Sequence, residues 1–224
     1  MIKSEVHEVL VTLYLRLNGY FTTGLIVHSP SWGNVRAEID CLAIRHPHHE
    51  QSDRVIETDA FLDPQEALAD LIICEVKSNP QQVRFNESLR TNPEILQRVL
   101  GWTGVLEREQ WSSVADKLQA LLRADVSGKE VRAGIIEGSC RVRPLLCCPP
   151  SLEPIDNRWC LTWTEISRFI NDCLTPQQRR QSCSTQYPFD LWGYPFAPII
   201  KHFKDKSNKA TLENLYEFLG ATKS

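Results

Sequence analysis

The sequence predicts an α/β fold in which a mixed β-sheet is flanked by helices on both faces. Several segments repeat apolar residues every three or four positions, which indicates amphipathic helices. Short runs rich in β-branched residues lie between them and indicate strands. The run at 70–77 is apolar enough to be buried on both faces, as a strand in the centre of a covered sheet is. The order of helix, strands, helices, strands and helix is typical of this class.

The first part of the chain predicts a helix followed by two paired strands. Residues 4–17 have apolar side chains at helical spacing, and Ser4 is a suitable N-cap. Residues 20–28 are apolar and β-branched and end at Pro30, while residues 36–44 alternate between polar and apolar side chains. We therefore expect a hairpin after the first helix.

The middle of the chain predicts an excursion from the sheet and then the central strand. Residues 45–69 are polar and contain three neighbouring histidines, to which we assign no role because a polar insertion exposes them to solvent. We expect a helical turn at 64–69, the central strand at 70–77 and a loop at 78–90. The further expected elements are helices at 93–108 and 111–124, strands at 131–137 and 144–148, a helix at 163–174 capped by Thr164, and a helix near 198–203.

Length and composition favour one large core with a modest appendage. The chain has 224 residues, with 25 Lys and Arg against 28 Asp and Glu, which is an ordinary globular balance. We expect an α/β core at 1–174 that includes the insertion at 45–69, and an extension at 175–224 packed on that core. The extension is richer in proline and aromatic residues, and the region of Trp192 offers a stacking surface for nucleic-acid bases.

Charge and cysteine content limit the partners and the compartment. The formal net charge of −3 gives no overall attraction to nucleic acid or to an anionic membrane, so a polyanion needs a local basic patch. Apolar runs are too short to span a membrane and the first residues are charged, so we expect a cytoplasmic protein whose eight cysteines are reduced thiols. The candidate basic patches are Arg141 with Arg143, Arg179 with Arg180, and Lys201 with Lys204 and Lys206.

Two carboxylates and one ammonium group are expected to converge where the central strand ends. Glu75 and Lys77 are two positions apart and so share a face of their strand. Asp40 lies within the preceding strand, where aspartate is depleted and costly to bury unpaired, and Glu38 is the alternative. Two carboxylates and a backbone carbonyl, such as that of Val76, are hard oxygen ligands for Mg²⁺. Such a site with a nearby lysine suits phosphodiester hydrolysis by a metal-activated water.

The short motif alone is weak evidence. A triplet of an acid, any residue and lysine is expected roughly once by chance in a chain of this composition. Glu75-Val76-Lys77 also suits a simple ion pair at the end of a strand. Its value comes from context, because it closes a strong strand and follows both a strand with a central acid and a helix that carries acids.

In this context the chain resembles the PD-(D/E)XK nuclease superfamily, whose restriction-endonuclease-like fold is shared by Holliday-junction resolvases. Ile39 stands where the superfamily has proline, and the 34 residues between Asp40 and Glu75 require the insertion. The resemblance covers about residues 5–100 in order and spacing, and is carried by a helix with Glu8, by Asn18-Gly19-Tyr20-Phe21 before the first strand, by Ile39-Asp40 on the second, and by Glu75-Val76-Lys77-Ser78 on the third.

The resemblance implies a metal-dependent nuclease with a restriction-endonuclease-like mixed sheet. Two acids and a carbonyl would bind Mg²⁺ or Mn²⁺, a lysine would be catalytic, and a glutamate of the first helix would position a metal-bound water. DNA is the expected substrate because the families it resembles act mostly on DNA, RNA is the alternative, and a homodimer or larger complex is compatible. The rival interpretation is a catalytically silent nuclease-like domain that binds nucleic acid or a protein partner. By this resemblance, the metal ligands in this chain are Asp40, Glu75 and the Val76 carbonyl, and the catalytic lysine is Lys77. The glutamate of the first helix is Glu8 or alternatively Glu5.

Overall fold

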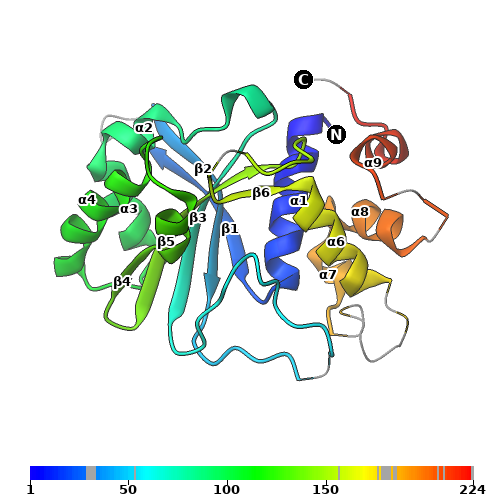
Figure 1. Ribbon diagram of the computed structural model, residues 1–224, viewed down its shortest axis with the longest axis horizontal. Helices are drawn as coiled ribbons and strands as arrows, with labels where there is room; N and C mark the ends of the chain where they lie inside the picture. The colour runs from blue at the N-terminus through cyan, green and yellow to red at the C-terminus, as the bar shows by residue number, and fades with distance from the viewer. Residues whose placement is uncertain are drawn as a thin grey trace.

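The computed structural model describes residues 1–28, 34–52, 54–155, 157–175, 177, 183, 186–205, 207–208 and 210–222. This part of the chain is an α/β protein with a mixed six-stranded open sheet flanked by helices (Figure 1), which confirms the expected class. Its elements are α1 (Lys3–Leu17), β1 (Phe21–His28), β2 (Val35–Arg45), β3 (Ala69–Val76), η1 (Pro80–Gln82), α2 (Glu87–Thr91), α3 (Pro93–Thr103), η2 (Arg108–Gln110), α4 (Trp111–Leu121), α5 (Gly128–Ala133), β4 (Ile135–Glu137), β5 (Cys140–Cys148), β6 (Cys160–Thr162), α6 (Trp163–Leu174), α7 (Phe189–Trp192), α8 (Phe196–Lys204) and α9 (Leu212–Leu219).

The central strand of the sheet is β3, as its sequence predicts. The strand order is β1-β2-β3-β5-β4, and β6 pairs with β5. The strands β1, β2 and β3 are antiparallel neighbours, whereas β3 runs parallel to β5. β5 is also parallel to β6 and antiparallel to β4. Every residue from 70 to 75 is buried, because helices cover both faces of this strand.

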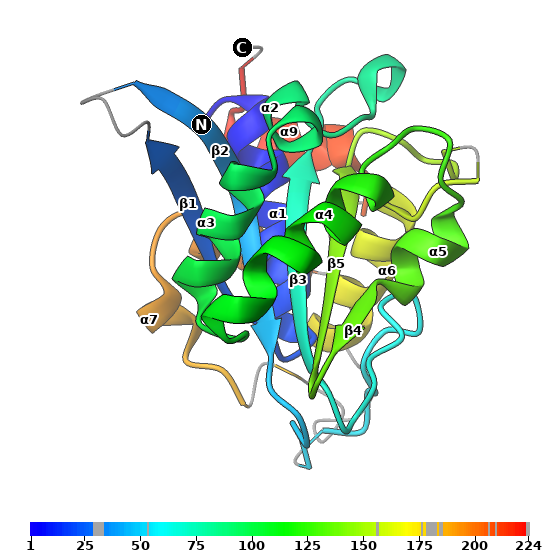
Figure 2. The ribbon, with the colours of Figure 1, turned by 90° about the vertical axis from the view of Figure 1, so that its left-hand side faces the viewer.

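Helices on the two faces of the sheet create two apolar cores. The core on one face draws on α1, α6, α8 and α9, and the core on the other face draws on α2, α3 and α4. Figure 2 shows α3 and α4 in front of the sheet and α1 behind it. Among the described residues, no helix combines the length and the apolar character that crossing a membrane requires.

The chain after α6 packs against the first helix. Phe196, Ile199 and Leu215 belong to the same apolar core as α1. An isolated parallel bridge joins Ile2 to Thr222, so the two ends of the described chain lie side by side. The helices α8 and α9 therefore help to hold α1 in place on the sheet.

Two helix boundaries differ from the expectation for physical reasons. The helix expected to continue to 108 ends at Thr103, because Gly104 adopts a left-handed backbone conformation that stops it. Residues 131–133 are helical and not part of a strand. They belong to α5, whose N-terminus is satisfied by a capping box on Ser127. Only the last residues of the strand expected at 131–137 form β4.

Other local expectations are also wrong. The short helix α2 begins within the loop expected at 78–90. The segment 64–69, expected to be a helical turn, contains a turn but no helix. The N-cap of α6 is Thr162 and not Thr164, because Thr162 forms a capping box with the third helical residue. The turn expected at Pro30 lies outside the described residues.

Two described residues of the insertion at 45–69, Asp59 and Leu62, are buried against the core. Leu62 is 0% exposed and belongs to the core of α1. Asp59 is buried and accepts hydrogen bonds from the Tyr14 hydroxyl and from the Arg168 guanidinium. The backbone N–H of Asp59 donates to Asn18 at the end of α1. These contacts attach this part of the insertion to α1 and α6.

Arg141 and Arg143 form a buried cluster and not the basic patch expected from sequence. Both are 0% exposed, and both donate to the carboxylate of Asp70, which also accepts from the Tyr20 hydroxyl at 2.6 Å. This pairing moves the start of β5 from the expected residue 144 to Cys140. Of the other candidate basic residues, Lys201 and Lys204 are exposed on α8, and Arg179, Arg180 and Lys206 lie outside the described residues.

The cysteines are not all free thiols. Cys173 at the end of α6 and Cys183 form a disulfide with a Cα–Cα distance of 4.9 Å, so the expectation of eight reduced thiols is wrong for this pair. The other six cysteines are free and buried in the sheet. Burial raises the pKa of the Cys140 thiol to about 11, which leaves it protonated near neutral pH.

Candidate functional site

The ladder between β2 and β3 ends beside the candidate acids, and the two strands separate there. The last cross-strand pair is Cys41 with Cys74. Beyond this pair, the backbone N–H of Val76 donates to the side-chain Oδ2 of Asp40 at 2.6 Å. Figure 2 shows the β1–β2 hairpin turning away from the end of β3. Asp40 therefore connects β2 to β3 at the place where the two strands separate, beyond the pair of Cys41 and Cys74; we call this place the fork.

A β-bulge determines the direction of the Asp40 side chain. The register between β1 and β2 shifts at Gly24, so this residue lies opposite both Asp40 and Cys41. Ile39 packs in the core on the α3 side, whereas Cys41 packs in the core of α1. Asp40 points to the α1 side, because neighbouring side chains of a regular strand alternate and Ile39 points to the α3 side. The bulge interrupts this alternation, so Cys41 also points to the α1 side.

Glu75 and Lys77 form an ion pair on the other face of β3. Cys74 and Val76 belong to the α1 core, so Glu75 between them points toward α2 and α3. Lys77 Nζ lies 2.5 Å from Glu75 Oε1 and donates to Asn86 Oδ1 at 2.9 Å. Glu75 is 1% exposed, and its Oε2 is buried without a hydrogen-bond partner among the described residues. The shared face expected for Glu75 and Lys77 is confirmed.

The two candidate acids of α1 have different surroundings. Glu5 accepts the N–H of Ile2 through Oε2 at 2.9 Å and so caps the helix. Glu8 has no side-chain hydrogen bond to the described residues. Burial, and then the charges of Asp40, Glu38 and Glu5, raise the pKa of Glu8 to about 7. Glu8 is exposed, and of the two acids it is the one on which the charge of Asp40 acts.

Carboxylates from three elements crowd this end of the sheet. Burial raises the pKa of Glu75 to about 7, the charge of Asp40 adds to this rise, and the hydrogen bond from Lys77 opposes it. Burial also raises the pKa of Asp40, against the Val76 N–H and the charge of Lys77, which lower it. Neighbouring negative charges in a partly buried place favour either protonation or a bound cation.

The donor atoms present suit a hard divalent cation. Oδ1 of Asp40 and Oε2 of Glu75 are not hydrogen-bonded to any described residue. Within the described ranges, no three His, Cys, Asp or Glu side chains form a cluster that could hold a metal ion. Asp40 and Glu75 point to opposite faces of the sheet, so a cation shared by both would have to lie between the separating strands. With the Val76 carbonyl and water as further ligands, these oxygens would form a donor set that Mg²⁺ accepts.

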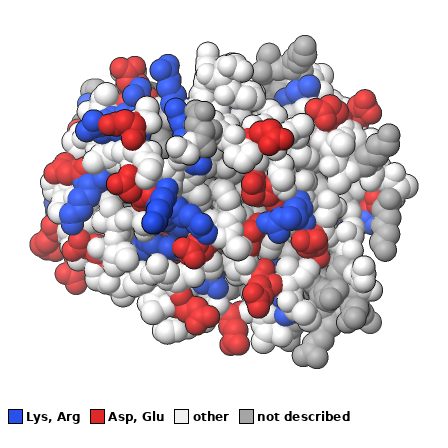
Figure 3. All heavy atoms as spheres, in the orientation of Figure 1, with Lys and Arg blue, Asp and Glu red and all other residues white. Residues whose placement is uncertain are grey.

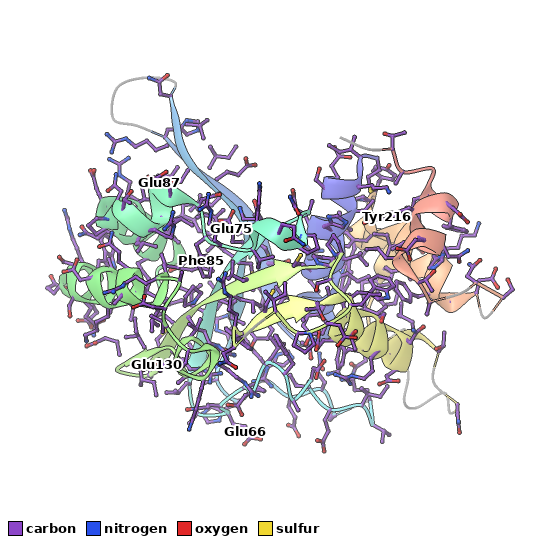
Figure 4. The ribbon with its side chains drawn as sticks, turned by 45° about the horizontal axis from the view of Figure 1, so that its top comes forward. Glu66, Glu75, Phe85, Glu87, Glu130 and Tyr216 are labelled. Carbon is purple, nitrogen blue, oxygen red and sulfur yellow. A yellow bond between two sulfur atoms is a disulfide. The ribbon has the colours of Figure 1, made fainter. Side chains whose placement is uncertain are left out.

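Several residues that the sequence pattern does not single out lie at this end of the sheet. His7 of α1 is buried and hydrogen-bonds Ser78 through Nδ1 at 2.8 Å and the Tyr216 hydroxyl through Nε2. A cavity of about 350 Å³ lies beside these three side chains, and Figure 4 labels Tyr216 and Glu75. One feature of the sequence could have drawn attention to His7. It lies next to Val6 on the apolar face of the helix, where a buried polar side chain needs a hydrogen-bond partner.

Asn86 is another residue at this end of the sheet that the sequence pattern does not single out. It lies in the segment expected to be a loop, and its only signal is a polar side chain shortly after the motif. The structure gives it a defined place, because its Oδ1 accepts from Lys77. Lys77 is thus oriented from two sides, by Glu75 and by Asn86.

Comparison with known proteins identifies no relative. No protein-family model matches the chain, and neither a curated protein nor a solved structure is significantly similar to it. A fold class of this breadth does not define an activity. The function has to be argued from the residues at the fork.

Proposed function

We propose that this chain is a metal-dependent nuclease of the restriction-endonuclease-like class that hydrolyses phosphodiester bonds, with DNA as the favoured substrate. One observation carries the proposal. The Asp40 carboxylate is hydrogen-bonded to the peptide N–H of Val76, the residue between Glu75 and Lys77. Asp40 and the Glu75–Lys77 pair therefore lie on either side of the Val76 peptide where the two strands separate, and a cation between them would bring the two acids together.

The metal would be Mg²⁺ or Mn²⁺, held by Asp40, Glu75 and the Val76 carbonyl. The free Oε2 of Glu75 supports this assignment, because a buried carboxylate oxygen without a partner is costly. The bound cation would polarise a phosphate and lower the pKa of a coordinated water. Asp40 keeps its Val76 hydrogen bond through Oδ2 and offers Oδ1 as a ligand.

Lys77 and Glu8 have the complementary roles. Lys77 can donate to a phosphate oxygen and stabilise the charge that develops there, and Asn86 restricts the directions in which its ammonium group points. Glu8 of α1 is affected by the charge of Asp40 and has no side-chain hydrogen bond to a described residue, so it could accept a proton from, or orient, an attacking water.

Arginines near the fork can hold the phosphate backbone. Figure 3 shows acidic and basic side chains interspersed on one face, so attraction to a polyanion has to be local. Arg84, Arg90 and Arg158 line a cavity of about 120 Å³ next to Phe85, close in sequence to Asn86. These residues replace the buried Arg141 and Arg143 as candidate phosphate contacts.

The test is cleavage by the purified full chain. Single-stranded DNA, duplex DNA and RNA are incubated with Mg²⁺, Mn²⁺ or chelator. We expect cleavage that needs the metal and that falls by about 10²-fold or more in Glu75→Gln and in Lys77→Ala. Thermal unfolding of each variant shows whether it is folded.

Matched controls separate the site from a general loss of charge. Glu87→Gln removes an exposed acid on α2, which Figure 4 labels near Glu75, and Lys117→Ala removes an exposed lysine that pairs with Glu137 on β4. Both controls should cleave like the original chain. Absence of cleavage on all three polymers, with binding that survives Lys77→Ala, would replace the nuclease by a silent nucleic-acid-binding domain.

A further inference from the structure

Residues of the insertion line a polar cavity of about 500 Å³, and two of them are buried arginines. Arg45 at the end of β2 is 6% exposed and Arg54 is 7% exposed. His49 and Gln51 also belong to the lining. Buried arginines beside a cavity call for an anionic partner, because a desolvated guanidinium is costly unless it is paired.

Neither guanidinium is saturated by the protein. Arg45 donates through Nη2 to the His49 carbonyl at 2.9 Å, and its Nε is buried without a partner. Arg54 donates through Nη1 to the Leu17 carbonyl at 2.6 Å and contacts the sulfur of Cys183, and its Nε is also buried without a partner. Within the described residues, Nη1 of Arg45 and Nη2 of Arg54 have no hydrogen bond.

No described carboxylate forms a salt bridge with either arginine. The contrast with the other buried arginines is direct, since Arg141 and Arg143 both pair with Asp70. The acids among the lining residues, Glu50, Glu57 and Glu66, are exposed and form no salt bridge within the described residues. Two cationic groups thus lie buried at the cavity without a salt bridge to a described carboxylate.

His49 connects this cavity to a second, more apolar one. Its ring packs directly over Gly19, where any Cβ would collide with it, and Gly19 has a φ of +85° that favours glycine. The second cavity, of about 340 Å³, shares His49 and is also lined by Tyr187 and Trp192. Burial, followed by repulsion from Arg45 and Arg54, lowers the pKa of His49.

The cavity is separate from the fork. Arg45 follows Asp40 by five residues along β2, which corresponds to about 17 Å of extended strand. Figure 4 shows Glu66, a lining residue, far from Glu75. A ligand in the cavity would therefore not touch the proposed metal ligands.

We propose that this cavity binds the phosphate group of a small phosphorylated molecule between the guanidinium groups of Arg45 and Arg54. A guanidinium offers a planar pair of N–H donors that matches phosphate geometry, and two such groups match the charge of a phosphate monoester. The aromatic cavity beyond His49 has room for the organic part of the ligand. The site stands independently of the nuclease proposal.

Titration calorimetry and thermal unfolding of the full chain test the site. The probes are inorganic phosphate, adenosine 5′-monophosphate, and adenosine without phosphate. We expect the nucleotide to bind and to raise the melting temperature, and adenosine to do neither. Tighter binding of the nucleotide than of inorganic phosphate supports the assignment of the organic part to the second cavity, and equal binding limits the site to the phosphate group.

Two variants and one control complete the experiment. We expect each of Arg45→Gln and Arg54→Lys to weaken binding by about ten- to a hundredfold. Arg54→Lys does so although it keeps the charge, because lysine lacks the planar pair of N–H donors. Arg108→Gln removes an exposed arginine that makes no hydrogen bond among the described residues and should bind normally. Melting of each variant without ligand shows that it is folded.

Three outcomes would overturn the proposal. The first is no binding of phosphate or nucleotide at millimolar concentration. The second is equal binding of adenosine and its monophosphate, which would remove the role of the arginines. The third is binding of a divalent cation whose affinity falls in Glu66→Gln but not in Arg45→Gln, because the exposed acids would then define the site.

Discussion

The Oδ2 atom of Asp40 lies 2.6 Å from the backbone nitrogen of Val76, so a side chain of β2 accepts the N–H at the point where backbone pairing with β3 has ended. This contact lets the strands separate without leaving that donor unsatisfied. It also ties Asp40 to the peptide between Glu75 and Lys77. Charge and hydrogen bonding at Asp40 can therefore be separated by substitution.

The buried charge cluster at the other end of β3 should dominate the stability of the fold. Asp70 is 1% exposed and receives hydrogen bonds from Arg141, Arg143 and Tyr20. Replacing it by asparagine leaves two desolvated guanidinium groups without a countercharge. We expect Asp70→Asn to lower the free energy of unfolding by about 3–5 kcal/mol, measured by denaturant titration.

An exposed ion pair provides the comparison. Glu94 pairs with Arg36 at 3.0 Å, and the Glu94 side chain is 54% exposed. Glu94→Gln should therefore change the free energy of unfolding by less than about 1 kcal/mol. If Asp70→Asn were no more destabilising than Glu94→Gln, the cluster would contribute little to the fold.

The cysteines should fall into two classes by their reaction with a thiol reagent. The chain has eight cysteines, of which Cys173 and Cys183 form a disulfide. We expect the denatured, unreduced chain to react with a thiol reagent at six cysteines, and the reduced chain at all eight. In the native state at pH 8 the labelling should be slow, because burial raises the pKa of Cys140 to about 11 and that of Cys160 to about 12 and leaves little thiolate. Eight reactive thiols before reduction would contradict the disulfide.

Local sequence patterns predict much of the fold, and the failures have particular causes. The helix α1 and the strand β3 follow from apolar periodicity, which depends only on near neighbours in the chain. The early start of β5 does not follow from such patterns, because two arginines close together indicate an exposed segment. Arg141 and Arg143 are buried only because Asp70, far away in the chain, pairs with both. Such non-local pairing leaves no local signal.

Two of the missed elements, β6 and α9, show different causes. The strand β6 has three residues and continues directly into α6, so its apolar pattern merges with that of the helix. The helix α9 does have a signal, because Thr211 caps it and Gly220 ends it in a left-handed conformation. A capped segment of this length could have been predicted from the sequence.

The candidate site was predictable as a set of residues but not as a geometry. The spacing of Glu75 and Lys77 predicts their shared face, and their ion pair confirms it. The bulge opposite Gly24 has no sequence signal strong enough to predict it, and it decides the direction of Asp40. The contribution of Asn86 depends on how a loop folds back, which periodicity does not describe.

The helix acid can be identified by a pair of substitutions. The charge of Asp40 raises the pKa of Glu8, while Glu5 accepts the N–H of Ile2 at the start of the helix. If Glu8 orients the attacking water, Glu8→Gln should reduce the cleavage rate by about ten- to a hundredfold without unfolding the chain. Glu5→Gln should leave cleavage within a few-fold of the original rate and lower the melting temperature slightly, because a helix cap is weakened. The reverse order of rates would assign the role to Glu5.

Substitutions at Asp40 should separate its two roles. Asp40→Asn keeps a side-chain oxygen that can accept the Val76 N–H but loses the charge that a divalent cation needs. We expect this variant to melt close to the original chain and to lose metal-dependent cleavage. Asp40→Ala also loses the acceptor, so it should in addition lower the free energy of unfolding by about 1–3 kcal/mol.

Glu38 provides the control on the same strand. It is exposed, and its charge also raises the pKa of Glu8. If Asp40 is the ligand, Glu38→Gln cleaves normally while Asp40→Asn does not, and calorimetry with Mn²⁺ shows binding to the first variant alone. Loss of cleavage in Glu38→Gln with normal cleavage in Asp40→Asn would transfer the ligand role to Glu38 and leave Asp40 as a structural acceptor for Val76.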